Sequence, residues 1–374
     1  MFVKEINLIG FRNYLEAQLK LDKQKTIIIG RNAQGKSNLI EVIQLLSYFK
    51  SRRSKKDAEL INFEMNEAVV KVHLDRPDDD TDDELALLIR KSGRRTYKLN
   101  GSNQKVKDIL HKLLSVSFMS EDLNIINSSP STRRDYLDSI IKQVDLIYLE
   151  NLSNFEKSLT QRNSYLKDLI DKEVYYPRSM KATQKEQLQI WNEVYIDHAN
   201  KVIQSRRDFI NQIEPLANKF YQEISGKPEA QLSLNYASED LSLEALDEIL
   251  GRDLARGYSN LGPHRDDFEI LLNDKDASSF ASQGEKRSII LALKLSELEL
   301  LHQKHDQYPV LLLDDVLAEL DEDRQDFLLD AVSSKAQVII TTTHLGKHLE
   351  KWSQDSQIVE IEDGAIVHKE LALN

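Results

Sequence analysis

Eight consecutive residues have the types and spacing of a phosphate-binding loop: Gly30, Arg31, Asn32, Ala33, Gln34, Gly35, Lys36 and Ser37. The glycines let backbone N–H groups converge on phosphate oxygens, and a helix beginning here adds its positive end. Lys36 would neutralise the β- and γ-phosphates, and the Ser37 hydroxyl would coordinate Mg²⁺. A β-branched run at 26–29 precedes the loop, and helical apolar spacing follows it to about Phe49. This context disfavours a chance match, and the sequence predicts binding of ATP with Mg²⁺.

A phosphate-binding loop needs a carboxylate at the end of a neighbouring buried strand. The apolar run 309–313 is followed directly by Asp314 and Asp315. Such a run is typical of a central parallel strand, whose C-terminal edge would carry both carboxylates. We expect Asp314 to hold Mg²⁺ and Asp315 to be catalytic, by orienting the attacking water.

The N-terminus of a second predicted helix could also bind a phosphate group of the nucleotide. Ser282 is followed three residues later by Glu285, which is a capping box in its ordinary interpretation. A Ser-x-Gly-Glu turn at a helix N-terminus is also suited to bind phosphate. Ser282, Gly284 and Glu285 are therefore candidate nucleotide contacts.

These candidates need a sheet to position them, and both ends of the chain supply strands. Strand-like runs occur at 3–9, 26–29, 68–74, 84–89, 266–272, 309–313 and 336–342. The middle is rich in Lys, Glu, Gln and Leu, and amphipathic stretches at 145–173 and 178–224 predict paired antiparallel helices. The expected fold class is α/β: a P-loop ATPase head split in sequence into 1–130 and 251–374, with a mainly α-helical lobe at 131–250.

Composition excludes several classes of protein. The chain has 374 residues, 50 Lys plus Arg against 62 Asp plus Glu, a net charge of −12, and no Cys. The lack of Cys excludes disulfide scaffolds, thiolate zinc sites and cysteine nucleophiles. No apolar run reaches the roughly 18 residues of a membrane helix. The N-terminus also lacks the order of a signal peptide, so we expect a cytoplasmic protein with no membrane partner.

Local charge departs from the acidic total. Seven of the residues 75–84 are acidic, which predicts a solvated hairpin tip. Five of the residues 50–56 are instead basic, namely Lys50, Arg52, Arg53, Lys55 and Lys56, and a second cluster holds Arg90, Lys91, Arg94 and Arg95. Such runs are often only solvated faces. Contacts to the DNA backbone nevertheless require this local density, so the residues at 50–56 are our candidates for binding duplex DNA.

The order of these motifs resembles that of the ATP-binding-cassette (ABC) ATPases, whose S-x-G-x signature lies between the P-loop and the magnesium carboxylate. Leu317–Asp321 resembles their D-loop, and His344 resembles their catalytic switch histidine. The resemblance implies an ATP-dependent homodimer in which the signature of one subunit closes over ATP held by the other. The interval between Ser37 and Ser282 leaves room for short helical arms but not for a long coiled coil.

Within that superfamily the chain resembles the RecF family of DNA replication and repair proteins. The strings that carry the resemblance are Gly10–Tyr14, Gly262–Asp267, and Arg133-Arg134 with Asp138. It implies that Arg12 contacts the nucleotide and that Glu121 helps hold the metal, in the role of the Q-loop glutamine. Gly262–Asp267 could equally be a structural turn with ion pairs.

The family resemblance implies an ATP-gated clamp on duplex or gapped DNA, released by slow hydrolysis. It further implies roles in gap repair and recombinase loading, with RecR, helped by RecO, as partner. Related heads use an Arg near 50–56 to sense DNA and nucleotide together, so Arg52 or Arg53 could have that role. The alternative is that the chain is the ATP-binding subunit of a membrane transporter. The long interval between Ser37 and Ser282 and the string Gly262–Asp267 disfavour this alternative. A nuclease-coupled ATPase would need a further domain, but only about thirty residues follow His344.

Overall fold

The computed structural model describes residues 2–21, 24–54, 56–75, 82–332 and 335–367. They form two compact units, the first made of Met1–Leu123, Leu216–Glu229 and Ser282–Asn374, and the second of Asn124–Pro215 and Ala230–Ala281. The expected α/β head, split in sequence by a helical lobe, is confirmed. The division differs from the expected boundaries, because residues 124–130 and 251–281 group with the helical unit and 216–229 with the head.

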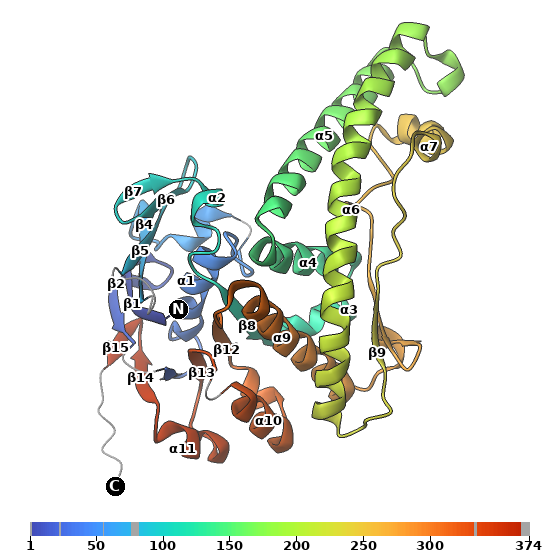
Figure 1. Ribbon diagram of the computed structural model, residues 1–374. Coiled ribbons are helices and arrows are strands. Elements are labelled where there is room, and N and C mark those ends of the chain that lie inside the picture. The colour runs from blue at the N-terminus through green and yellow to red at the C-terminus, as the bar shows by residue number, and fades with distance from the viewer. Residues whose placement is uncertain (1, 22–23, 55, 76–81, 333–334, 368–374) are drawn as a thin grey trace. The chain divides into compact units, whose positions relative to one another are not determined.

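An antiparallel sheet lies on one side of the first unit's core (Figure 1). Its strands are β1 (Phe2–Phe11), β2 (Tyr14–Lys20), β4 (Glu67–Asp75), β5 (Asp83–Arg90), β6 (Thr96–Leu99) and β7 (Ser102–Gln104), in the order β2-β1-β4-β5-β6-β7. Burial alternates along β4, as it does where one face of a sheet meets a core. β4 and β5 form the predicted hairpin, with Leu74 opposite Asp83. Residues 76–81 of its acidic tip lie outside the described residues.

A second sheet positions the phosphate-binding loop. Its strands are β3 (Lys25–Ile29), β8 (Ser115–Met119), β12 (Val310–Asp314), β13 (Val338–Thr342), β14 (Gln357–Glu362) and β15 (Ala365–Val367), in the order β15-β14-β3-β13-β12-β8. All neighbours are parallel except β14 and β15. Every residue of β12 is buried, which explains its apolar run. Because parallel strands end at the same edge, the loop after β3 and Asp314 at the end of β12 meet there.

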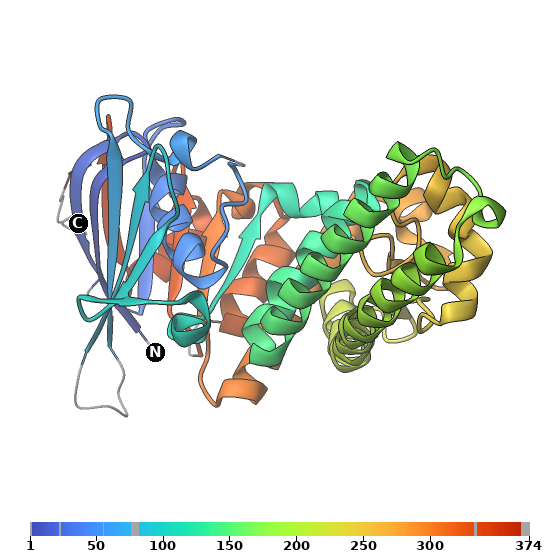
Figure 2. The ribbon, with the colours of Figure 1, turned by 90° about the horizontal axis from the view of Figure 1, so that it is seen from above.

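Helix α1 (Lys36–Ser47) lies between the two sheets (Figure 2). Its Leu39 and Leu46 share one buried cluster with Leu87 of β5 and Leu312 of β12, so the helix after the phosphate loop joins both layers. The unit also contains α2 (Val106–Ile109), α9 (Gln283–His305), α10 (Glu322–Val332), α11 (Lys347–Ser353) and the 3-10 helices η1 (Asp57–Leu60), η2 (Ser120–Leu123) and η4 (Val316–Glu319). Helix α9 is buried over most of its length and contacts β8.

The second unit is mainly helical. It contains α3 (Asn124–Asn127), α4 (Pro130–Val144), α5 (Leu146–Asp171), η3 (Pro177–Ser179), most of α6 (Ala182–Ser225), α7 (Leu243–Arg256), α8 (Ala277–Phe280), and a small sheet of β9 (Leu232–Asn235), β10 (Glu269–Leu272) and β11 (Lys275–Asp276). Helices α5 and α6 run side by side as the predicted antiparallel pair (Figure 1). Leu166 and Leu169 of α5 pack in one cluster with Leu188 of α6 and Leu254 of α7.

Several strands have too little sequence pattern to be predicted, namely β2, β6, β7, β8, β9, β14 and β15. Most are short, and β8, β9 and β14 also pair with strands that are distant in the sequence. The predicted strand 266–272 begins only at Glu269, because Asp266 and Asp267 bind side chains of the helical unit instead of joining the ladder.

Candidate nucleotide-binding site

The phosphate loop and the strand-end carboxylate come together as predicted. The Ser37 hydroxyl donates to Asp314 Oδ1 at 2.7 Å, and Thr341 Oγ1 at the end of β13 donates to the same oxygen at 2.6 Å. Lys36 Nζ donates to the carbonyls of Gly30 and Arg31 at 2.8 and 3.0 Å, so its side chain curls over the loop. The Ser37 hydroxyl and the Asp314 carboxylate thus place two possible metal-ligand oxygens close together, beside a loop that carries the positive charge of Lys36. This is a donor set that suits Mg²⁺.

Asp315 and His344 lie at the same sheet edge. The Asp315 backbone N–H donates to Thr341 Oγ1 at 3.1 Å, and His344 N–H donates to Thr342 Oγ1 at 3.4 Å. Burial raises the pKa of Asp315, and nearby Asp314 raises it too, while Lys36, Arg53 and His344 act in the opposite direction. A carboxyl group with a raised pKa beside the loop is suited to accept a proton from an attacking water.

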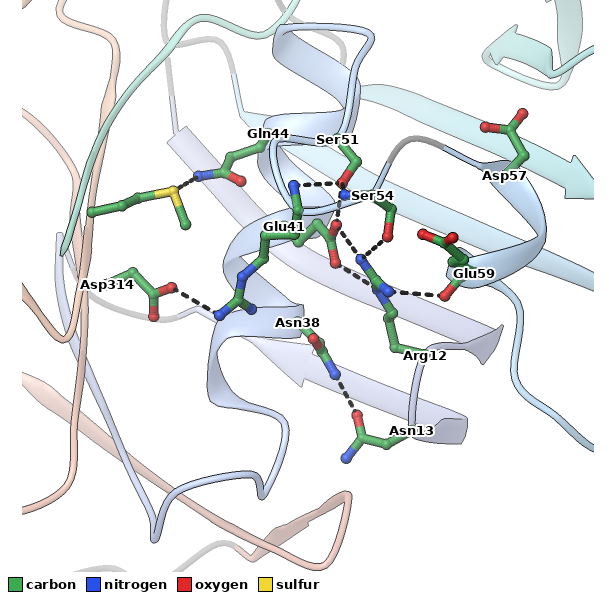
Figure 3. A network of polar contacts seen from close by, with 12 residues as sticks. Arg12, Asn13, Asn38, Glu41, Gln44, Ser51, Ser54, Asp57, Glu59 and Asp314 are labelled. Carbon is green, nitrogen blue, oxygen red and sulfur yellow. Dashed lines mark hydrogen bonds and ion pairs between the residues drawn. The ribbon is translucent and has the colours of Figure 1, made fainter. Parts of the chain in front are cut away.

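Asn13 and Tyr14 support the phosphate loop, a role that the sequence analysis did not assign to them. Asn13 Nδ2 donates to the Gln34 carbonyl at 3.0 Å, and the Tyr14 hydroxyl donates to the Gly35 carbonyl at 3.1 Å. Asn38 Nδ2 in turn donates to Asn13 Oδ1 at 2.7 Å (Figure 3). Both residues belong to the string Gly10–Tyr14, and this string was the sequence feature from which their role could have been predicted.

Arg12, a predicted nucleotide contact, is bound to helix α1. Its Nε and Nη2 donate to the two oxygens of the fully buried Glu41 at 2.8 and 2.7 Å (Figure 3). Arg12 also donates to Ser54 Oγ and the Glu59 carbonyl, and Ser51 Oγ donates to Glu41 at 2.6 Å. Arg12 therefore fixes the segment after α1, and its contact with nucleotide stays a prediction.

The predicted DNA-binding residues differ in their exposure and in their contacts within the protein. Arg52 donates to the buried Asp122 at 2.9 Å, and Arg53 Nη2 lies 4.0 Å from Asp314 Oδ2, facing the phosphate site. Lys50 and Lys56 are exposed, and Lys55 lies outside the described residues. In the second cluster, Arg95 is bound to Asp57 and to the Phe49 carbonyl. Arg52 and Arg95 are thus committed to contacts within the protein.

Two further groups of predicted residues have local roles. The capping box forms, because Ser282 N–H donates to Glu285 Oε2 at 2.9 Å and Glu285 N–H donates to Ser282 Oγ at 3.3 Å. Ser282 Oγ also donates to Glu285 Oε2 at 2.8 Å. These hydrogen bonds from Ser282 lower the pKa of Glu285. Glu121 is exposed on η2, next to the buried Asp122. The nucleotide contacts of Ser282, Gly284 and Glu285, and the metal contact of Glu121, stay predictions.

The string Gly262–Asp267 is a turn with ion pairs inside the helical unit. Asp267 accepts two hydrogen bonds from Arg133, both 2.7 Å, and Asp266 accepts one from Tyr236 at 2.6 Å. The Pro263 carbonyl accepts from Arg206 at 2.6 Å. A Cβ on Gly262 would lie 2.2 Å from the Tyr195 hydroxyl, so only glycine fits there. The structure supports the structural interpretation of this string.

Comparisons with known proteins agree with this arrangement. The RecF/RecN/SMC N-terminal domain matches residues 2–366. The chain is 39% identical to the DNA replication and repair protein RecF of Gloeobacter violaceus, covering 98% of each, and 38% identical to that of Microcystis aeruginosa, covering 98% of this chain and 100% of the relative. A solved structure of the recombination mediator protein RecF with ATP, from the RecFOR pathway, superimposes with a TM-score of 0.86 at 32% identity over 98% of this chain and 97% of that one.

A more distant structural neighbour shows the fold alone. An Smc head bound to the C-winged helix domain of ScpA superimposes with a TM-score of 0.55 at 17% identity, covering 100% of this chain and 98% of that one. Within the described parts of the chain, no helix has the length and apolar character needed to cross a membrane. The full-length match, the phosphate loop and the split head together show that the chain belongs to the RecF family of DNA replication and repair proteins.

Proposed function

We propose that this protein binds and hydrolyses ATP and uses ATP to control its binding to DNA in replication and repair. The observation that carries the proposal is the meeting of the Ser37 hydroxyl with the Asp314 carboxylate at 2.7 Å, at the edge where Lys36 closes the loop. RecF relatives that cover 98% of the chain, and solved structures named RecF-ATP and RecF-ATPrS, support it. The transporter alternative is not favoured, because the chain belongs to the RecF family.

In the proposed mechanism the loop 30–37 binds the ATP phosphates through its N–H groups, and Lys36 neutralises the β- and γ-oxygens. Ser37 and Asp314 would hold Mg²⁺, which would neutralise negative charge on the phosphates. Asp315 orients the attacking water and accepts its proton, and His344, at the end of the adjacent strand, contacts the γ-phosphate. Thr341 positions both carboxylates, since it donates to Asp314 and accepts from the Asp315 N–H.

We propose that ATP joins two copies of the chain. Ser282 and Gly284 of one copy would close over ATP held by the loop of the other, because a capped helix N-terminus presents N–H groups to phosphate. The closed dimer would hold duplex or gapped DNA, and slow hydrolysis would release it. RecR, helped by RecO, is the proposed partner in loading recombinase.

We propose that DNA meets the head at residues 50–56. Lys50 and Lys56 are exposed and suited to phosphate contacts, while Arg53 lies beside Asp314. Arg53 would therefore respond to ATP on one side and to DNA on the other. Replacement of either lysine should weaken binding to all DNA sequences alike. It should also reduce the slope of log affinity against log salt concentration by about one.

Sedimentation with and without ATP, repeated with gapped and intact duplex, tests the proposal. The wild type should dimerise only with ATP. Lys36→Ala should lose ATP binding and dimerisation together, whereas Ser282→Arg should still bind ATP but stay monomeric. Ser164→Arg, the same change at an exposed position of α5, is the control and should dimerise normally. Dimerisation that ignores ATP, or a Ser282→Arg protein that dimerises like the wild type, would contradict the mechanism.

A further inference from the structure

The structural role of the string Gly262–Asp267 accounts for every residue in it except Arg265. Contacts inside the helical unit bind the other five, namely Gly262, Pro263, His264, Asp266 and Asp267. Arg265 is instead exposed, and its guanidinium lies over the ring of Tyr258, with Cζ 5.3 Å from the ring centre. Tyr258 is itself 36% exposed. The turn therefore presents a cation, supported by an aromatic ring, at the surface of the helical unit.

Two more cations lie beside Tyr258. Arg256, the last residue of α7, is exposed and donates to Asn260 Oδ1 at 2.8 Å, and Asn260 Nδ2 donates to the Tyr258 carbonyl at 3.0 Å. A Cβ on Gly257 would lie 3.5 Å from Lys167 Cγ, so the stem of this exposed lysine of α5 passes the same turn. Among the described residues, neither these two cations nor Arg265 forms an ion pair with a carboxylate.

Other arginines of the helical unit are paired with carboxylates inside it. The distances between the charged atoms are 2.7, 2.7 and 2.8 Å for three pairs, namely Arg133 with Asp267, Arg162 with Asp253, and Arg206 with Asp138. A fourth carboxylate, Asp266, lies beside Arg134, which donates to the Asp266 backbone carbonyl at 2.7 Å. Arg256, Arg265 and Lys167 differ from these arginines, because their charges are exposed and remain available to an anion from outside the protein.

The backbone of DNA suits this surface better than a protein partner does. Protein interfaces have a core of apolar and aromatic side chains, with charged residues at the rim. Tyr258 is the only large hydrophobic side chain exposed between residues 253 and 267, all of which the structure describes. A DNA backbone is instead bound by Arg and Lys through charge and hydrogen bonds to phosphate oxygens. An arginine that lies on an aromatic ring also keeps its planar group of donors oriented for phosphate.

We propose that Arg265, Arg256 and Lys167 bind the phosphate backbone of DNA, as a contact made by the helical unit in addition to residues 50–56. The inference rests on the proposed function, since its ligand is the DNA of that proposal. Arg265 donates to phosphate oxygens from its position on Tyr258, and Arg256 and Lys167 add positive charge beside it. Each phosphate contact contributes about 0.9 to the slope of log affinity against log salt concentration, so losing one should weaken binding roughly eightfold at about 0.1 M salt.

Arg265→Gln tests the site, because it removes the charge and keeps a planar group that can lie on Tyr258. The affinity of the full chain with ATPγS for a fluorescent duplex is measured by anisotropy between about 50 and 200 mM salt. We expect the slope to fall by about one, with thermal unfolding as in the wild type. Arg178→Gln is the matched control and should bind as the wild type does, since Arg178 Cζ lies 5.6 Å from the ring centre of Tyr176, which is also exposed.

Arg256→Gln is the second variant and should show the same fall in slope, and the double variant Arg256→Gln/Arg265→Gln should show about twice that fall. The inference is overturned, and the proposed function left intact, if both folded single variants keep the wild-type slope or if Arg178→Gln lowers it equally. It is also overturned if Arg265→Gln keeps DNA binding but loses binding of polyglutamate, because the surface then takes an acidic protein segment. If neither single variant folds, the turn is a stability element and the inference is overturned. If the wild type binds no DNA, the proposed function fails first and the inference with it.

Discussion

Gly35→Ala tests whether the phosphate loop depends on the Asn13–Tyr14 support seen in the structure. Gly35 has φ +111°, and a Cβ there would lie 2.6 Å from Asn13 Nδ2 and 2.8 Å from the Tyr14 hydroxyl. Those two side chains donate the hydrogen bonds to the Gln34 and Gly35 carbonyls. The methyl group can be accommodated only if the side chains or the loop move, and either movement breaks these bonds.

The expected losses of ATP affinity and of stability follow from the two hydrogen bonds and from the backbone conformation of Gly35. Each net hydrogen bond contributes about 1 kcal/mol, so losing the pair should weaken ATP binding by about 2 kcal/mol, or roughly 30-fold. The left-handed backbone adds a stability cost of about 1–3 kcal/mol. Gly93→Ala isolates that second cost, because Gly93 has φ +106° but nothing lies within 4 Å of its Cβ position.

Calorimetric titration with ATP and thermal unfolding of both variants separate the two effects. Gly93→Ala should lose stability and keep wild-type ATP affinity, whereas Gly35→Ala should lose both. The reasoning is refuted if Gly35→Ala binds ATP within about threefold of the wild type. It is also refuted if Gly93→Ala loses ATP affinity to the same extent.

Three further predictions concern buried ionisable groups. Asp253→Ala removes the carboxylate that lies 2.7 Å from the fully buried Arg162, and it should lower the free energy of unfolding in urea by about 3–5 kcal/mol. Asp240→Ala is the control, because Asp240 forms an exposed pair with Arg207, and it should lower this free energy by no more than about 1 kcal/mol. Because burial raises the pKa of Asp315, its ionisation disfavours folding. Asp315→Asn should therefore abolish hydrolysis yet unfold at a higher temperature at neutral pH. This gain should shrink as the pH falls through the raised pKa and vanish below the ordinary value of 3.8. Burial lowers the pKa of His264, so stability should be fully present above the ordinary value of 6.5 and should be lost as the pH falls from there through the lowered pKa. His264→Gln should show a smaller loss in unfolding curves across that range.

The parts of the site that could be predicted are those whose chemistry lies in a short contiguous segment. The loop 30–37 contains its own glycines, Lys36 and Ser37, and the apolar run ending at Asp314 contains both its burial pattern and its carboxylate. The capping box from Ser282 to Glu285 spans a single helical turn. Backbone propensity and periodicity operate over such distances, and the predictions of the P-loop, the central strand and the paired helices α5 and α6 were accordingly close.

The sequence by itself therefore determined the type of head, its phosphate loop and the helical insertion. Only the tertiary structure decided which charged residues face outward, because each pairing depends on a partner far along the chain. Arg52 is bound by Asp122, Arg95 by Asp57, and Arg133 by Asp267. Asp122 is a buried carboxylate, and leaving it unpaired would cost several kcal/mol. Asp57 and Asp267 are about a third exposed, and they pair with arginines that are themselves mostly buried. These pairings bind part of the basic sequence inside the protein and leave Lys50 and Lys56 at its surface.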